Sequence, residues 1–131
     1  MPSRPRSWRS RRQSRENVAV VRRGYEQFAI SRQFVAELTR ADFVWDMSNF
    51  HGWPEQQTYE GVEGAEAFLR EWIAAWDDWE IEAEVFHDAG DKVVAVMRQR
   101  GRSKATGAPV DMHFAQVWTL DAGERTRMEI R

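Results

Sequence analysis

The sequence predicts a single α+β domain in which helices pack on one face of a curved, mostly antiparallel sheet. Apolar residues recur at intervals of three and four through the first half of the chain, as in amphipathic helices. In the second half they alternate with polar residues, as in strands. A chain of 131 residues is long enough for one core, and it has no cysteine for a disulfide, a thiolate metal site or a nucleophile.

An arginine-rich arm, residues 1–15, precedes the domain predicted over residues 16–131. The arm has six arginines, no acid and a single tryptophan, so we expect it to be disordered. All 21 acidic residues follow it, which makes the domain acidic. An acidic domain repels the polyanions that such an arm attracts, and we therefore do not expect a nucleic-acid partner.

Three helices are expected from the apolar spacing. The first begins near Ser14 as its N-cap, with Glu16 in the first turn, and presents one apolar face made of Val18, Val21, Tyr25 and Phe28. After an interruption at residues 31–32, a short second helix is expected to carry Phe34, Val35 and Leu38. The third spans residues 62–76 and has the most regular spacing, at Ala65, Phe68, Leu69, Trp72, Ile73 and Trp76.

Strands are expected wherever apolar residues alternate. Residues 43–47 form the first, and residues 48–57 form a loop because Asn, Gly and Pro punctuate them. Turn residues separate the later strands, which are expected over residues 81–85, 93–104, 110–120 and 125–131.

The strand over residues 110–120 is strongly apolar on one side. One parity holds Val110, Met112, Phe114, Gln116, Trp118 and Leu120, and the other is mixed. Such a strand suits a sheet that is covered on both faces, yet the helices cover only one. If the apolar parity lies outside, a partner subunit is its natural cover, and we predict a homodimer through the outer sheet face.

Nothing in the sequence indicates a membrane span, a metal or a cofactor. No apolar run reaches the length of a membrane helix and no signal peptide is evident, so we expect a cytoplasmic protein. Asp111 and His113 lie two apart on one strand face, but no third metal ligand is evident. There is no glycine-rich phosphate loop either.

Four stretches carry a family resemblance: VVRRGYEQFAISRQFVAEL, VWDM, TYEGVEGAEAFLREW and FAQVWTLDAG. In this order and spacing the chain from Asn17 to Arg131 resembles the nuclear-transport-factor-two-like superfamily, and within it the SnoaL-like polyketide cyclases and ketosteroid isomerase. The resemblance implies a cone-shaped domain, in which a bent sheet wraps a long helix around an apolar pocket. It also implies dimers through the outer sheet face, although the fold hosts many activities.

The resemblance implies a catalytic site as well. Asp46 in VWDM takes the place of the general base of ketosteroid isomerase, and Tyr25 takes that of a hydrogen-bond donor to the oxyanion. Ala115 replaces the second donor, a protonated acid in the isomerase, which argues against the same reaction. His113 shares the parity of Ala115 and is a candidate replacement donor.

The residues themselves leave alternatives open. Asp46 among aromatic neighbours is either a base whose pKa is raised by burial or a turn residue that binds the backbone of Ser48 and Asn49. Tyr25 is either a donor or a core aromatic, and His113 either a donor or a structural histidine. A ligand site is further expected to include the loop residues His51 and Trp53, together with Trp72, Met97 and Ala115.

Two functional hypotheses follow. The first is a SnoaL-like small-molecule-binding protein that performs cofactor-free acid–base chemistry, of isomerase or cyclase type, on a small apolar substrate that is carbonyl-bearing or cyclic. The alternative is a non-catalytic module of the same fold that binds a ligand or dimerises. The geometry around Asp46, Tyr25 and His113 discriminates between them.

Overall fold

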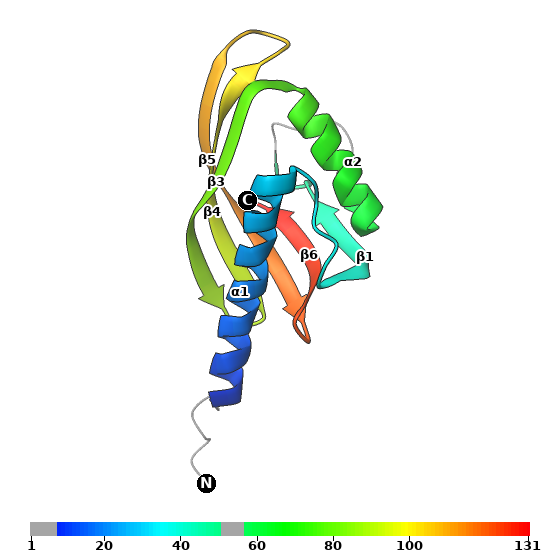
Figure 1. Cartoon of the computed structure of the whole chain (residues 1–131), viewed down its shortest axis with the longest axis vertical. Coiled ribbons are helices and arrows are strands. Elements are labelled where there is room, and N and C mark those ends of the chain that lie inside the picture. The colour runs from blue at the N-terminus through cyan, green and yellow to red at the C-terminus, as the bar shows by residue number, and fades with distance from the viewer. Residues whose placement is uncertain (1–7, 51–56) are drawn as a thin grey trace.

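The computed structural model describes residues 8–50 and 57–131, with the backbone alone for residues 8–11. In this part of the chain, two helices and six strands form the α+β domain that the sequence predicts. The helices are α1 (Trp8–Ser31) and α2 (Gly61–Ala74) (Figure 1). The strands are β1 (Thr39–Asp46), β2 (Thr58–Glu60), β3 (Trp76–Ala89), β4 (Lys92–Ser103), β5 (Pro109–Asp121) and β6 (Glu124–Ile130).

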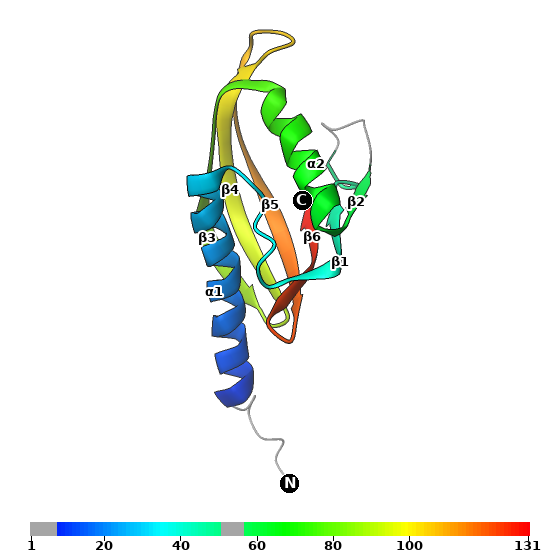
Figure 2. The ribbon, with the colours of Figure 1, turned by 45° about the vertical axis from the view of Figure 1, so that its right-hand side comes forward.

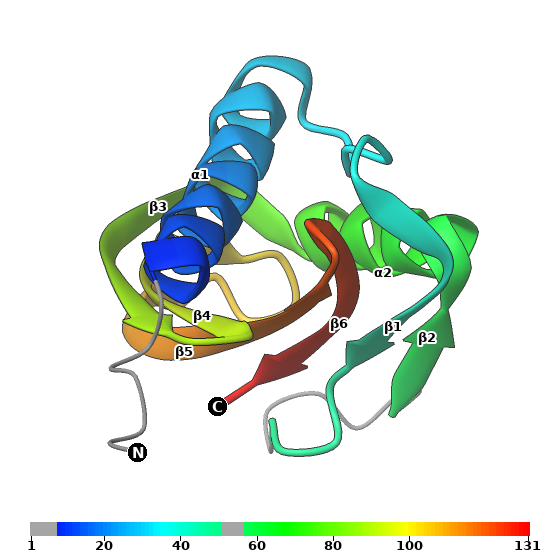
Figure 3. The ribbon, with the colours of Figure 1, turned by 90° about the horizontal axis from the view of Figure 1, so that it is seen from below.

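The strands form one open sheet in the order β2-β1-β6-β5-β4-β3. Every neighbouring pair is antiparallel except β1 and β6, which run parallel. The sheet curves strongly, and both helices lie on its concave side (Figures 2 and 3). This arrangement agrees with the predicted cone and places the core between helices and sheet.

Helix α1 is longer than expected at its N-terminus. It begins at Trp8 and not near Ser14, so part of the segment expected to be a disordered arm is helical. Its C-terminus agrees with the expected interruption, because Arg32 adopts a positive φ of 59° and donates its N–H to the carbonyl of Phe28 at 2.8 Å. A left-handed residue at this point ends an α-helix.

The second predicted helix is wrong, since residues 32–38 form an irregular connection. Arg32 and Leu38 both have positive φ, which an α-helix does not contain. Phe34 is nevertheless buried, because it packs on Phe43 with ring centroids 5.4 Å apart. The apolar residue Phe34 therefore serves contacts with the sheet and not a helix face. Leu38, which was expected on the same helix face, is 43% exposed.

Two element boundaries also differ from expectation. Strand β2 lies directly after the predicted loop and was not expected; its Tyr59 pairs with Trp45 of β1 and is buried. Trp76, expected to be the last helical position, begins β3 and pairs with Ser103. Helix α2 is otherwise confirmed, and its buried face consists of Ala65, Phe68 and Trp72.

The apolar parity of β5 faces inward, toward the helices. Gln116, Trp118 and Leu120 are buried in the core, and Met112 and Phe114 line the space beneath α1. The premise for the homodimer, that this parity lies outside, is therefore wrong. The convex face instead carries the mixed parity, on which His113 is exposed and Ala115 and Val117 are half-buried.

Candidate functional site

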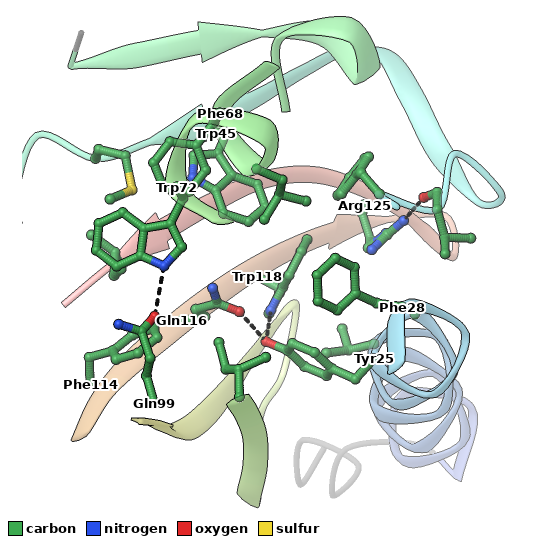
Figure 4. Close-up of a pocket in the computed structure, with 18 of the residues that line it drawn as sticks. Tyr25, Phe28, Trp45, Phe68, Trp72, Gln99, Phe114, Gln116, Trp118 and Arg125 are labelled. Carbon is green, nitrogen blue, oxygen red and sulfur yellow. Dashed lines mark hydrogen bonds between the residues drawn. The ribbon is translucent and has the colours of Figure 1, made fainter. Parts of the chain in front are cut away.

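The concave face encloses an apolar pocket between α1, α2 and strands β1, β3, β4, β5 and β6 (Figure 4). Aromatic side chains dominate its walls: Tyr25, Phe28, Phe34, Trp45, Phe68, Trp72, Trp79, Phe114 and Trp118. The cavity of this pocket has a volume of about 60 Å³. Because one water needs roughly 10–15 Å³ of such space, the cavity holds a few waters, and a larger guest requires wall side chains to move.

Polar groups in the pocket are few. Among the described residues that line it, Arg125 carries the only charge, and there is neither a carboxylate nor a histidine. The other polar groups are a phenol, two amides and indole N–H groups, on Tyr25, Gln99, Gln116, Trp45, Trp72, Trp79 and Trp118. The pocket therefore offers hydrogen bonds to a ligand but no conventional general base.

Tyr25 lies in the pocket, as expected, and its hydroxyl is part of a buried relay. The indole N–H of Trp118 donates to the Tyr25 oxygen at 2.7 Å, and the Tyr25 hydroxyl donates to Oε1 of Gln116. Burial raises the pKa of the Tyr25 hydroxyl above its usual range, so it stays protonated. Its single proton is committed to Gln116, which leaves none for a ligand in this arrangement.

A second hydrogen bond joins α2 to β4. The indole Nε1 of Trp72 donates to Oε1 of Gln99 at 2.7 Å. Since an indole N–H only donates, this bond fixes the orientation of the amide and turns Nε2 of Gln99 away from Trp72. That Nε2 is buried without a hydrogen-bond partner, and so are the indole Nε1 atoms of Trp45 and Trp79.

Asp46 lies at the end of β1, as the resemblance implies, but on the convex side of the sheet, away from the pocket. It does not line the cavity. Its carboxylate accepts the backbone N–H of Ser48 at 2.8 Å and binds the guanidinium of Arg127. Burial opposes its ionisation, but these bonds outweigh burial and keep its pKa below the usual value. The geometry agrees with the turn-residue alternative, with Ser48 as the backbone donor.

The inward placement of His113 and Ala115 is wrong. The imidazole of His113 is 57% exposed on the convex face, where its Nε2 lies 2.9 Å from Oε1 of Glu84. Ala115 shares that face and pairs through its backbone with Arg131 at 2.9 and 2.7 Å. The inward residues beside them on β5 are Phe114 and Gln116. Tyr25, Asp46 and His113 therefore do not converge on one cavity.

The other expected ligand-site residues divide into three groups. Trp72 lines the pocket. Met97 is fully buried on the same face of the sheet but does not reach the cavity. His51 and Trp53 lie outside the described residues. The described part of the chain also holds no cluster of acids and histidines suited to a metal, and no helix long and apolar enough to cross a membrane.

Sequence reasoning missed Arg125, Gln99 and Gln116. The glutamines left a signal, because each interrupts the apolar parity of its strand at a position where a buried residue is due. Arg125 left none, because a register shift between Thr119 and Leu120 breaks the alternation between β5 and β6.

Comparison with known families decides the classification. The SnoaL-like domain model matches residues 11–128, nearly the whole described chain. The chain belongs to the SnoaL-like domain family. This confirms the resemblance, which rested on short stretches in order. No curated protein matches this SnoaL-like domain.

Solved structures share the fold of this SnoaL-like domain at low sequence identity. TerC co-crystallised with polyporic acid is 20% identical, with a TM-score of 0.73 over 88% of this chain and 90% of TerC. A putative SnoaL-like polyketide cyclase from Jannaschia sp. CCS1 is 22% identical, with a TM-score of 0.69 over 88% and 84%. A hypothetical protein from Catenulispora acidiphila with a ketosteroid isomerase-like fold, in complex with trimethylamine, is 18% identical, with a TM-score of 0.61 over 72% of this chain and 68% of that protein.

The position of Asp46 gives a prediction about stability. Replacing Asp46 with Asn is expected to lower the free energy of unfolding at pH 7 by about 1–3 kcal/mol, because the charge-assisted bond to Arg127 is lost. The pKa of Asp46 is lowered on folding, so its contribution is complete above the ordinary value of 3.8 and disappears as the pH falls through the folded value. Urea unfolding at pH 7 and pH 3 measures both effects.

The difference in the free energy of unfolding between the unchanged protein and Asp46→Asn is expected to be smaller at pH 3 than at pH 7. An equal difference at both pH values contradicts a contribution from the charge of Asp46. The control is Asp121→Asn, which removes an exposed carboxylate that pairs with Arg40 on the surface. This change is expected to have little effect at either pH.

Proposed function

We propose that this SnoaL-like domain binds a small, apolar, cyclic or carbonyl-bearing molecule in the pocket. One observation carries the proposal: an aromatic cavity contains buried hydrogen-bond donors that have no acceptor, on Trp45, Trp79 and Gln99. A buried polar group left unpaired costs about 1–3 kcal/mol. A ligand that brings acceptor oxygens into the cavity removes that cost, and the aromatic walls favour a planar ring.

The geometry favours binding over acid–base catalysis by the residues first considered. The base implied by the resemblance, Asp46, and the candidate replacement donor, His113, both lie on the convex face. The pocket lining offers Tyr25, whose raised pKa disfavours its use as a base. The non-catalytic alternative is therefore the function that we propose. The small molecules found with TerC and with the Catenulispora protein support ligand binding by this fold.

Matched ligands test the proposal. We expect 1-tetralone, a ketone, to quench the tryptophan fluorescence and to bind more tightly than the hydrocarbon tetralin, by about fivefold to tenfold for one added hydrogen bond. Trp79→Phe removes an unpaired N–H and leaves no partner behind, so it is expected to reduce this ketone preference. Isothermal titration calorimetry measures the affinities.

The control is His113→Gln, on the convex face, which is expected to change neither affinity. If neither tetralone nor tetralin binds, and a wider panel of planar ketones also fails, the proposed function is wrong. If tetralin binds as tightly as tetralone, the unpaired donors are not what the pocket uses for recognition.

We also propose that two copies associate through the convex sheet face. Val94 pairs with Val117, and Val96 pairs with Ala115, which forms a half-buried apolar strip between charged residues. A second copy of the strip is a natural cover for it. Light scattering at micromolar concentration is expected to give the mass of two chains, and Val117→Arg the mass of one. A single-chain mass for the unchanged protein contradicts the dimer.

A further inference from the structure

Arg125 is a buried cation with no acidic partner. Its residue is 3% exposed, on β6, and its side chain lines the pocket (Figure 4). None of the ion pairs among the described residues includes it. The arginines that do pair with acids, such as Arg98 and Arg127, have side chains that are 32% and 37% exposed. A buried arginine is normally the one that is paired with an acid, so an unpaired Arg125 in the core departs from the usual pattern.

Neutral groups hold the guanidinium in place. Its Nε donates to Oγ1 of Thr39 at 3.0 Å, and its Nη2 donates to the same oxygen at 2.6 Å and to the carbonyl of Val35. The group also lies over the rings of Phe34 and Trp118, at 4.8 and 5.0 Å from their centroids. These contacts orient the cation, but none of them neutralises it.

One nitrogen of Arg125 makes none of these bonds. Nη1 lies against Gly24 of α1, where a Cβ would be only 3.0 Å from it, so a glycine at this position makes room for the guanidinium. Burial lowers the pKa of the guanidinium to about 10, and the group is still charged at neutral pH. A positively charged donor with an unused N–H therefore borders an apolar cavity.

The far end of the pocket has a different character. In the sheet register, Gln99 lies opposite Met112 of β5, and Arg125 lies opposite Leu120 of β5. The positions of Gln99 and Arg125 are therefore eight residues apart when they are measured along β5. Figure 4 shows Trp72 and Gln99 on one side of the cavity and Arg125 on the other, with the Tyr25 relay between them. A charged end and a neutral donor end thus flank an aromatic middle.

We infer that the natural ligand is an organic anion, an aromatic or otherwise planar carboxylate whose charged oxygen pairs with Arg125 while its apolar body lies among the aromatic side chains. The inference rests on the proposed ligand-binding function and narrows its substrate class. A carboxylate is well suited to an arginine, since the guanidinium offers charge together with directed N–H groups.

A purely structural role for Arg125 is the competing explanation, because its bonds to Val35 and Thr39 tie the 32–38 connection to β6. The two explanations differ in what they predict for a charged ligand and its neutral isostere. A structural arginine affects both ligands alike. A recognition arginine affects only the anion.

The experiment compares 2-naphthoate with 2-naphthamide by calorimetry at pH 7. The unchanged protein is expected to bind the carboxylate at least about tenfold more tightly than the amide. Arg125→Met is expected to abolish that preference, and Arg125→Lys to retain part of it. Arg98→Met, which removes a convex-face arginine, is expected to leave the preference intact. If Arg125→Met does not fold, the comparison of Arg125→Lys with the unchanged protein decides, and an undiminished preference overturns the inference.

Equal binding of naphthoate and naphthamide by the unchanged protein overturns the anion inference while the ligand-binding function stands. A carboxylate preference that survives in Arg125→Met also overturns it. If neither compound binds and the planar ketones fail as well, the proposed function falls, and the inference falls with it.

Discussion

Tyr25→Phe is expected to lower the free energy of unfolding by about 2–4 kcal/mol, with little change in the shape of the core. The hydroxyl that is lost accepts the N–H of Trp118 and donates to Gln116. Both partners are then left unpaired in a buried site, at about 1–3 kcal/mol each. Urea denaturation followed by circular dichroism measures the loss, and tryptophan fluorescence confirms that the native packing is kept.

A double-mutant cycle separates the relay from the rest of the packing. In a Gln116→Leu background, Tyr25→Phe orphans the Trp118 N–H alone, so its effect is expected to be smaller by 1 kcal/mol or more. Equal effects in both backgrounds contradict a coupled relay. A loss below about 1 kcal/mol in the single variant would mean that water replaces the hydroxyl.

The order of elements was predictable because most segments have an unambiguous apolar period. Helix α2 and strands β4 and β5 follow their patterns closely, since one face of each is buried in the core. The 32–38 segment was not predictable, because its apolar residues have helical spacing although Arg32 and Leu38 adopt positive φ angles that a helix excludes. Packing of Phe34 against β1 overrides local propensity there, and local spacing does not report such contacts.

The candidate site was predicted less well than the fold, and the parity of side chains explains most of the difference. Asp46 alternates with Phe43 and Trp45 and lies on the opposite face of β1, so the sequence already separated it from the apolar side. An inward His113 required the opposite side of β5, which carries Phe114 and Trp118, to face outward. These two aromatic side chains would then be left uncovered. Burying them beneath the helices is more favourable, and the polar parity then becomes the convex face.

Phe43→Ala is expected to be the most destabilising single change that we describe, with a loss of about 3–5 kcal/mol. The Phe43 side chain is fully buried, and its ring lies 5.4 Å from that of Phe34 and 6.0 Å from that of Trp118. It therefore joins the 32–38 connection, β1 and β5 in one cluster. Domains of this kind have total stabilities of about 5–15 kcal/mol, so the loss is a large fraction of the whole.

The same change is expected to weaken the pocket. Phe34 and Trp118 are the two rings under the guanidinium of Arg125, and both lose a packing partner when Phe43 is truncated. Thermal denaturation is expected to show a much lower Tm for Phe43→Ala and a small change for Leu38→Ala, whose side chain is largely exposed in the same region. Similar Tm values for the two variants would contradict the central place of Phe43, because the cluster would then hold together without it. Added 2-naphthoate is expected to raise the Tm of Phe43→Ala by less than it raises the Tm of the unchanged protein. The reason is that the rings that position Arg125 pack less firmly in the variant, so it binds the anion less tightly.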